Sequence, residues 1–482
     1  MSMAGTKWET VMGLEVHAEL STKSKIFCGC STAFGAAPNT NVCPGCAGMP
    51  GTLPKLNREV VEYAIKLGLA LNCEINTLCK FDRKNYTYPD LPKAYQVSQL
   101  YAPICRNGHL DIEVGDGQQK TIRIHQIHME EDAGKLVHNP RGGQTFMDFN
   151  RGGVPLLEIV TEPDFRSAEE VVAYLEKLRE TLLYLDICDC KMQEGSLRAD
   201  VNLSIRPVGG ELGVRAEMKN LNSFKAINRA IAYESNRHIE VLEDGGQLIQ
   251  ETRRWDDDLG ESFGMRSKAN AQDYRYFPDP DIPPVSIDDA WLARVKENMP
   301  ELAHQKRERY ISEYGLTSAD ASILTGHKNL SDLFEKISEK SGEPKESANL
   351  ILGEIMRLMN QTNTLPEDLT LDESKLVTLI GLVLGGKINR NAYKETIEVV
   401  FLNDANPEAY ISEKGLMMVS DSGAIAALVE AVIADNPSAI EDYKAGKQKA
   451  FGFLIGQVMK QLGGSGNPGM VKKVLIEKLG GK

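Results

Sequence analysis

The chain has 482 residues, enough for two to four domains of ordinary size. Apolar residues make up 42% of it and charged residues 26%, so a mostly disordered or fibrous chain is excluded. The formal net charge of −13 excludes a nucleic-acid-binding protein that is basic along its whole length, and leaves only a local basic patch for that role.

The sequence contains no apolar stretch of about 18 residues, and its start lacks the pattern of a signal or transit peptide. Its nine cysteines, an odd number, do not suit an extracellular disulfide framework. We therefore expect a cytoplasmic protein that makes no contact with a membrane.

The first three fifths of the chain predicts strands, because apolar and polar residues alternate there. In residues 14–20 the apolar positions alternate with Glu15 and His17, and residues 197–206 and 214–219 repeat the pattern. Since each strand has one polar face, an antiparallel sheet is favoured over an all-parallel one.

Helical periodicity interrupts these strands at residues 60–71 and 223–243, and after Ser167, which forms a capping box with Glu170. The proline-rich stretch 277–284 fits the interior of neither a helix nor a strand and predicts a linker.

Beyond Asp288 almost every segment has helical periodicity. The sequence therefore predicts an α+β protein in three parts. These are a mostly antiparallel-sheet domain over 1–287, a helical domain over 288–406 and a basic helical tail domain over 407–482.

Two closely spaced cysteine pairs form the clearest local motif: Cys28, Cys30, Cys43 and Cys46. Four thiolates at this spacing are typical of a structural zinc ion, whose closed tetrahedral shell leaves no position for a reacting water. The alternative is four unrelated buried thiols. We expect a zinc knuckle over residues 28–46.

Carboxylates recur on the polar faces and at the ends of the predicted strands. They are Glu15, Glu130, Glu131, Glu158, Asp200 and Glu217, and His17 shares a face with Glu15. Carboxylates on one sheet face repel one another unless a cation lies between them, and Mg²⁺ prefers oxygen ligands. The alternative is a solvated polar face, which spacing alone favours.

Basic residues mark two further features. Residues 80–93 and 273–278 interleave cations with aromatic rings, which suits phosphates and stacked bases as well as a stapled surface loop. From Lys444 to Lys482 eight lysines face one acid, which suits contact with a phosphate chain or a solvated basic helix. The candidate residues for contact with a phosphate chain are Lys444, Lys447, Lys449, Lys460, Lys472 and Lys473.

Seven motifs, in order along the chain, resemble the B subunits of tRNA-dependent amidotransferases, the GatCAB complexes. They are GLEVH at 13–17, KFDRKNY at 80–86, HMEEDAGK at 128–135, GSLRAD at 195–200, EMKNLNSF at 217–224, QETRRW at 250–255 and DYRYFP at 273–278.

This resemblance implies a catalytic cradle domain similar in fold to glutamine synthetase. ATP would phosphorylate the side-chain carboxylate of Glu-tRNA(Gln), Asp-tRNA(Asn) or both, which turns one carboxylate oxygen into a leaving group. Ammonia from glutamine would then displace the phosphate, as in an ATP-dependent carbon–nitrogen ligase. The implied protein partners are the amidase, or A, subunit and the small C subunit, in a heterotrimer, and the implied RNA partner is tRNA(Gln) or tRNA(Asn).

The resemblance also implies roles for single residues. One Mg²⁺ would be held by His17, Glu131 and Glu158, and a second by Glu15, Glu130 and Glu217. Lys84 and Asp200 would lie near the ammonia exit or the activated carboxyl, the four cysteines would hold zinc, and the tail would bind the outer corner of tRNA.

Two other function classes stay open from the residues alone. A noncatalytic scaffold would hold tRNA for a partner, and a metal-dependent hydrolase would act without ATP or tRNA. The sequence shows no evident nucleophile–base pair and no HExxH spacing, which counts against the hydrolase.

Overall fold

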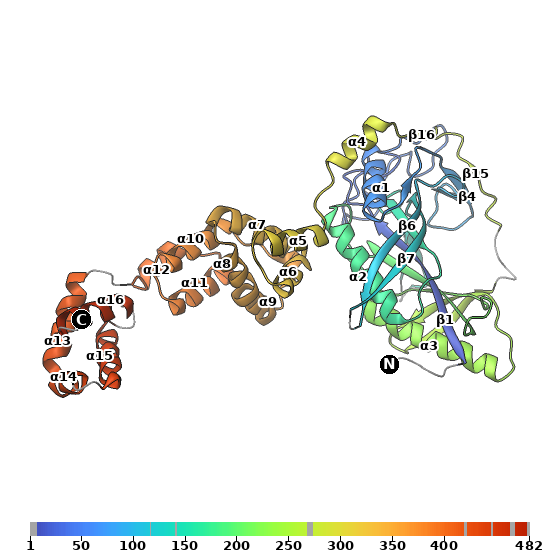
Figure 1. The fold of residues 1–482 in the computed structure, drawn as a ribbon. Helices are drawn as coiled ribbons and strands as arrows, with labels where there is room; N and C mark the ends of the chain where they lie inside the picture. Colours follow the sequence, from blue (N-terminus) through green and yellow to red (C-terminus); the bar gives the residue numbers. More distant parts are fainter. Residues whose placement is uncertain are drawn as a thin grey trace. The chain divides into compact units, whose positions relative to one another are not determined.

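The structure is a computed structural model, and it describes residues 7–115, 117–139, 142–267, 273–418, 422–444, 447–462 and 468–479. The chain divides into two compact units, Met1–Leu302 and Ala303–Lys482. The first is built around a large sheet and the second is helical (Figure 1), so the expected α+β class is confirmed.

Nine strands form the main sheet of the first unit, in the order β14-β13-β12-β11-β1-β10-β7-β6-β2. They are β1 (Trp8–Glu19), β2 (Glu74–Ile75), β6 (Cys105–Val114), β7 (Gln118–Glu131), β10 (Pro155–Thr161), β11 (Leu197–Pro207), β12 (Ala216–Lys219), β13 (Glu251–Asp256) and β14 (Glu261–Ser267). Neighbouring strands are antiparallel except β12 and β13, which agrees with the expected mostly antiparallel sheet.

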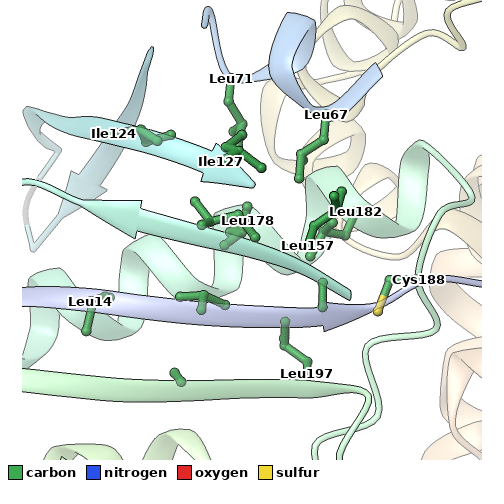
Figure 2. Close-up of a cluster of buried hydrophobic side chains, with 14 of the residues drawn as sticks. Leu14, Leu67, Leu71, Ile124, Ile127, Leu157, Leu178, Leu182, Cys188 and Leu197 are labelled. Atoms are coloured by element: carbon green, nitrogen blue, oxygen red, sulfur yellow. The ribbon is translucent and has the colours of Figure 1, made fainter. Parts of the chain in front are cut away.

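Helices cover the apolar face of this sheet. They are α1 (Arg58–Ala70), α2 (Ala168–Tyr184) and α3 (Phe224–Glu243). Figure 2 shows Leu67 of α1 and Leu178 of α2 in one buried cluster with Leu157 of β10. Each fully buried leucine contributes about 1.5–3 kcal/mol, so this apolar layer fixes which face of the sheet stays polar.

The start of α2 follows the expected capping box. Ser167 accepts a hydrogen bond from the backbone N–H of Glu170, and the Glu170 carboxylate accepts one from the backbone N–H of Arg166. These contacts satisfy amide groups that have no partner inside the helix.

Short strands form three smaller sheets in the same unit. They are β3 (Leu78–Cys79), β4 (Asp82–Asn85), β5 (Tyr95–Ser98), β8 (Lys135–His138), β9 (Thr145–Asp148), β15 (Phe277–Pro278) and β16 (Val285–Ser286).

The linker expected at residues 277–284 is wrong for its first two residues, which form β15 and pair with β4. Residues 279–284 form no helix or strand and lead into β16, which pairs with β3. A proline is tolerated in an edge strand, where its missing N–H is not needed. Arg83 then anchors the segment through ion pairs with Asp279, at 2.8 Å, and Asp281, at 2.7 Å. The first unit also includes α4 (Asp289–Glu297) and runs to Leu302, past the expected division at residue 287.

The second unit contains only helices among its described residues. They are α5 (Ala303–Ser312), α6 (Ser318–Thr325), α7 (Lys328–Ser341), α8 (Pro344–Asn349), the π-helical turn η2 (Leu350–Ile355), α9 (Met356–Thr362), the 3₁₀ turn η3 (Pro366–Asp368), α10 (Glu373–Leu384), α11 (Arg390–Asn403), α12 (Pro407–Glu413), α13 (Ser422–Asp435), α14 (Pro437–Lys444), α15 (Gln448–Gln461) and α16 (Pro468–Leu479).

Two separate apolar clusters stabilise these helices. One runs from Tyr310 to Ile411, and the other from Ile425 to Leu475. Across the described part of the chain, every helix is too short or too polar to cross a bilayer.

Candidate active site and metal centres

The face of the main sheet opposite the helices carries the candidate site, and β1 lies at its centre. His17 of β1 is directly opposite Glu158 of β10, and Glu158 is opposite His128 of β7. On the other side of β1, Glu15 is opposite Asp200 of β11. Because opposite residues in a sheet point to the same face, the strand register alone gathers these side chains.

The first cluster consists of His17, Glu130 and Glu158, whose ligand atoms all lie within 4.8 Å of one another. The Nε2 atom of His17 lies 3.5 Å from Oε1 of Glu130 and 3.6 Å from Oε2 of Glu158. The His17 side chain is 20% exposed, so the cluster is reached from solvent through the imidazole. One nitrogen and two carboxylates leave positions free for waters or phosphate oxygens on a bound ion.

Charge is unevenly distributed in this first cluster. Burial and the neighbouring carboxylate of Glu158 raise the pKa of Glu130. Burial also acts to raise the pKa of Glu158, but His128 and His17 outweigh it and hold that pKa well below its ordinary value. His128 accounts for most of this through a 2.5 Å contact between Nε2 and Oε2 of Glu158. A cation beside Glu130 would relieve the cost of ionising it.

Glu131 does not join the first cluster, although the role implied by resemblance placed it there in place of Glu130. Both its oxygens contact the ammonium of Lys93, at 2.5 and 2.6 Å, and Oε1 also accepts the N–H of Val97. Successive residues on a strand point to opposite faces, so β7 cannot bring Glu130 and Glu131 to the same ion. The structure gathers Glu130 with His17 and Glu158.

The second cluster consists of Glu15, Asp200 and Glu217. Lys219 lies within it, with Nζ 2.6 Å from Oδ2 of Asp200 and 2.8 Å from Oε1 of Glu217. Asp200, expected near the activated carboxyl, therefore lies with the residues expected to hold the second metal. Sequence reasoning assigned Lys219 no role, although alternation from Glu217 already placed it on the polar face.

Lys219 and burial act in opposite directions on the second cluster. Burial acts to raise the pKa of Glu217, but Lys219 outweighs it and lowers that pKa. For Glu15, burial and the charge of Glu158 raise the pKa, and the amide of Asn202 only partly compensates. The charge of Glu158 acts on Glu15, so the two clusters form one electrostatic unit.

Lys84 of β4 lies close to the first cluster, where its charge helps to lower the pKa of Glu158. Its ammonium lies 5.0 Å from the ring centre of Tyr274 and 5.9 Å from that of Tyr86. These rings belong to the two basic-aromatic segments, and the Asn85 N–H donates to the carbonyl of Tyr274. The two segments therefore form one wall that holds Lys84 near Glu158.

Two cavities open beside the second cluster. One, of about 260 Å³, is lined by Glu15 and Asn202 and by the apolar residues Val11 and Leu212. The other, of about 790 Å³, is lined by Asp200 together with polar side chains that include Arg198 and Asn222. The sheet face thus offers a small, partly apolar recess and a large polar one within reach of the same carboxylates.

The four cysteines of the expected zinc knuckle come together. Their sulfur atoms all lie within 4.8 Å of one another, and Sγ of Cys46 is 3.8 Å from that of Cys43. A hydrogen bond from the Cys28 thiol lowers the pKa of Cys46 to about 4 against the effect of burial, and Lys25 adds to this shift. Four converging thiols, one of them readily ionised, could hold a metal ion.

All six candidate tRNA-binding lysines lie on the surface of the tail: Lys444, Lys447, Lys449, Lys460, Lys472 and Lys473. Lys447 forms an ion pair with Asp442 at 2.8 Å. Apolar residues of α13, α15 and α16 pack beneath them, so the basic surface rests on a core of its own.

Comparisons with known proteins show the family of this chain. Residues 10–293 match the family described as "GatB/GatE catalytic domain", and residues 332–479 match the one described as "GatB domain". The B subunit of the aspartyl/glutamyl-tRNA(Asn/Gln) amidotransferase of Lachnoclostridium phytofermentans is 58% identical over 473 residues, which cover 98% of this chain and 99% of the relative. The subunits of the same name from Lachnospira eligens and Agathobacter rectalis are 56% and 54% identical, with the same coverage of 98% and 99%. The chain belongs to the family of aspartyl/glutamyl-tRNA(Asn/Gln) amidotransferase B subunits.

Proposed function

We propose that the chain is the B subunit of a tRNA-dependent amidotransferase, a ligase that uses glutamine as amido donor. The side-chain carboxylate of Glu-tRNA(Gln), Asp-tRNA(Asn) or both attacks the γ-phosphorus of ATP, and ADP leaves. Ammonia then attacks the carbonyl carbon of the acyl phosphate, loses a proton and expels phosphate. The observation that carries this proposal is the pair of carboxylate clusters on one sheet face.

The residues of the two clusters fit magnesium. His17, Glu130 and Glu158 would hold one Mg²⁺, and Glu15, Asp200 and Glu217 a second. Their donor set is mostly carboxylate oxygen, and burial together with neighbouring charge raises the pKa of Glu130 and of Glu15, a cost that a cation relieves. When bound, such ions neutralise charge on a transferred phosphoryl group.

Two cavities and two lysines beside the clusters suit the binding of the substrates. The recess of about 260 Å³ has apolar walls suited to a nucleoside, and the cavity of about 790 Å³ has room for the aminoacyl end of a tRNA. Lys219 and Lys84 place cations beside the carboxylates, where they orient and neutralise anionic groups of the substrates.

The proposal also assigns the outer parts of the chain. The four cysteines hold a structural zinc ion, because a closed thiolate shell leaves no site for a reacting group. The exposed lysines of the tail domain, over residues 407–482, contact tRNA phosphates. The amidase, or A, subunit supplies ammonia and the small C subunit completes the heterotrimer, which works in the cytoplasm.

ADP formation by the assembled complex tests the proposal. At fixed Mg²⁺ and ammonia, we expect ADP only when Glu-tRNA(Gln) or Asp-tRNA(Asn) is present, and the tRNA that supports it identifies the substrate. Glu130→Gln should reduce this rate by about 100-fold or more, since it removes a charge at the transferred group. Glu113→Gln, which changes an exposed carboxylate of β6, is the matched control.

A folded complex that forms no tRNA-dependent ADP would reject the kinase step. In that case binding of tRNA without turnover would favour the scaffold, and release of phosphate without tRNA would favour the hydrolase.

A further inference from the structure

Lys25 is a fully buried lysine beside the four-cysteine centre. Its side chain is 0% exposed, and its ammonium nitrogen lies 3.7 Å from Sγ of Cys46 and 3.2 Å from the carbonyl oxygen of Phe149. Among the residues that the structure describes, no carboxylate forms an ion pair with this ammonium. A buried charge without a counter-charge is strongly destabilising, so the chain must supply an anion at this point.

The available anion is the thiolate of Cys46. One carbonyl dipole does not balance a full positive charge, and four thiolates around a divalent cation carry a net charge of −2. A single ammonium at 3.7 Å from one of these sulfurs would halve that charge. In many metal sites, groups that contact a ligand without binding the ion affect the affinity for the metal, and the Lys25 ammonium is placed as such a group.

Backbone groups also lie close to the contact between Lys25 and Cys46. The N–H of Lys25 donates to the carbonyl of Cys30, which closes the turn that carries Cys28. Gly153 has φ +85°, and a β-carbon at this position would lie 3.5 Å from the Lys25 stem and 3.8 Å from Cβ of Cys46. Gly153, the lysine stem and Cys46 therefore lie side by side, along a cavity of about 240 Å³.

We propose that Lys25 is the built-in counter-charge of the four-cysteine centre, and that its ammonium strengthens binding of a divalent thiophilic cation through Cys46. The inference rests on the metal centre proposed above and is independent of the amidation reaction. It makes Lys25 a positioning residue of the metal site: it contacts a ligand and does not bind the ion.

Zinc affinity of the purified full-length chain tests this, measured by competition with a chromophoric chelator. Lys25→Met should weaken Zn²⁺ binding by about 10-fold or more, the usual effect of removing such an outer contact. Lys25→Gln keeps a donor for the Phe149 carbonyl but loses the charge, so it should show the same loss. Lys23→Met, which changes an exposed lysine two residues away, should leave the affinity unchanged.

A double-mutant cycle assigns the effect to Cys46. In a Cys46→Ser background Lys25→Met should weaken Zn²⁺ binding by no more than about two-fold, because the sulfur that it serves is gone. With Co²⁺ as probe, the sulfur-to-metal absorption should report four thiolates in the parent and in Lys23→Met.

Three outcomes would overturn the proposal. Parental zinc affinity in Lys25→Met would show that the lysine only fills space, and parental affinity in Lys25→Gln would make its hydrogen bond the useful part. If Lys25→Met weakened Zn²⁺ binding equally in the parent and in the Cys46→Ser background, Lys25 would have to act through a group other than Cys46. A parent chain that binds neither Zn²⁺ nor Co²⁺ would instead reject the metal centre itself, and would leave the amidation reaction untouched.

Discussion

Adjacent carboxylates at the end of β7 have opposite surroundings, and this decides what each can do. Glu130 faces His17 and Glu158, whereas Glu131 faces away and neutralises Lys93. The Glu131 side chain is only 7% exposed, so its ion pair with Lys93 is shielded from water. Breaking such a pair from one side leaves a nearly buried charge uncompensated.

We therefore expect Glu131→Gln to lower the free energy of unfolding by about 2–4 kcal/mol and to leave Mn²⁺ binding at the first cluster intact. Glu130→Gln should weaken Mn²⁺ binding, because it removes a ligand. It should not lower the free energy of unfolding, because it relieves the repulsion between Glu130 and Glu158. Urea unfolding can be followed by tryptophan fluorescence, since all three tryptophans belong to the first unit. Mn²⁺ titration supplies the second measurement. If Glu131→Gln abolished Mn²⁺ binding at unchanged stability, the ligand set would have to include Glu131.

The choice between Glu130 and Glu131 could not be made from the sequence. Alternation identified the polar faces of β1, β11 and β12 because those strands expose one face to water. At the end of β7 the residues from Ile127 to Glu131 are all buried, so the alternation of burial that marks a face disappears. Lys25 was missed for a similar reason, since its partner is a sulfur that only folding brings near.

At the scale of elements, one buried carboxylate joins α3 to β14. Glu234 is 0% exposed and accepts hydrogen bonds from Arg237 and from Ser262 Oγ, the latter at 2.7 Å. Burial acts to raise its pKa, but the contact with His238, at 3.2 Å, and the hydrogen bonds of Arg237 and Ser262 outweigh it and lower that pKa to about 2. Because the pKa of Glu234 is lower in the folded chain than in the unfolded chain, this carboxylate stabilises the fold above about pH 4.5. That contribution is lost as the pH falls toward 2.

Glu234→Gln should therefore lower the free energy of unfolding by about 3 kcal/mol at pH 7. The difference from the parent should shrink as the pH falls from about 4.5 toward 2, since the unfolded carboxyl takes up its proton first. Glu240→Gln, on the exposed side of the same helix, is the control. A loss of stability that does not vary with pH would assign the effect to packing.

The zinc knuckle, residues 28–46, is a second feature at the scale of elements. Backbone hydrogen bonds from Lys55 N–H to Phe27 and from Asn57 N–H to Ile26 close the base of its loop. The N–H groups of Asn39 and Asn41 donate to the side chains of Asp148 and Asn150. Gly48 packs against Lys93 on the Glu131 side of β7, and residues 32–36 of the loop line the larger cavity together with Asp200.

Removal of zinc, by a chelator or by Cys43→Ser, should loosen residues 21–52 without abolishing amidation. Hydrogen exchange of the assembled complex should rise within that segment, while ADP formation with tRNA persists. Complete loss of activity in a complex that is still folded would contradict this expectation and give the knuckle a direct part in the reaction.

Residues 277–284, expected to be a linker, show what local composition can and cannot predict about strands and helices. Prolines excluded regular structure there, yet β15 needs only two residues and pairs at a sheet edge. The partner of that edge, β4, lies nearly 200 residues earlier in the chain. Long-range pairing of this kind leaves no local signal.

At the scale of the whole molecule, charge separates the tail from the remainder of the chain. The lysines Lys449, Lys472 and Lys473 are exposed, and none forms an ion pair among the described residues, so their charge is available to a phosphate chain. Replacing all three with glutamine should reduce the slope of log affinity for tRNA against log salt concentration by about 2, since fewer counterions are released.

The matched control for that experiment is the triple replacement of Lys336, Lys345 and Lys387, exposed lysines outside the tail domain, which makes the same change in net charge. Binding titrations at several salt concentrations should separate the two variants, because a diffuse charge effect would weaken both equally. Since the core beneath the tail lysines is apolar and untouched by these changes, thermal unfolding should be the same for both variants. Equal loss of tRNA affinity in the two would reject the tail as the phosphate-contacting surface, and an unchanged slope in the tail variant would do the same.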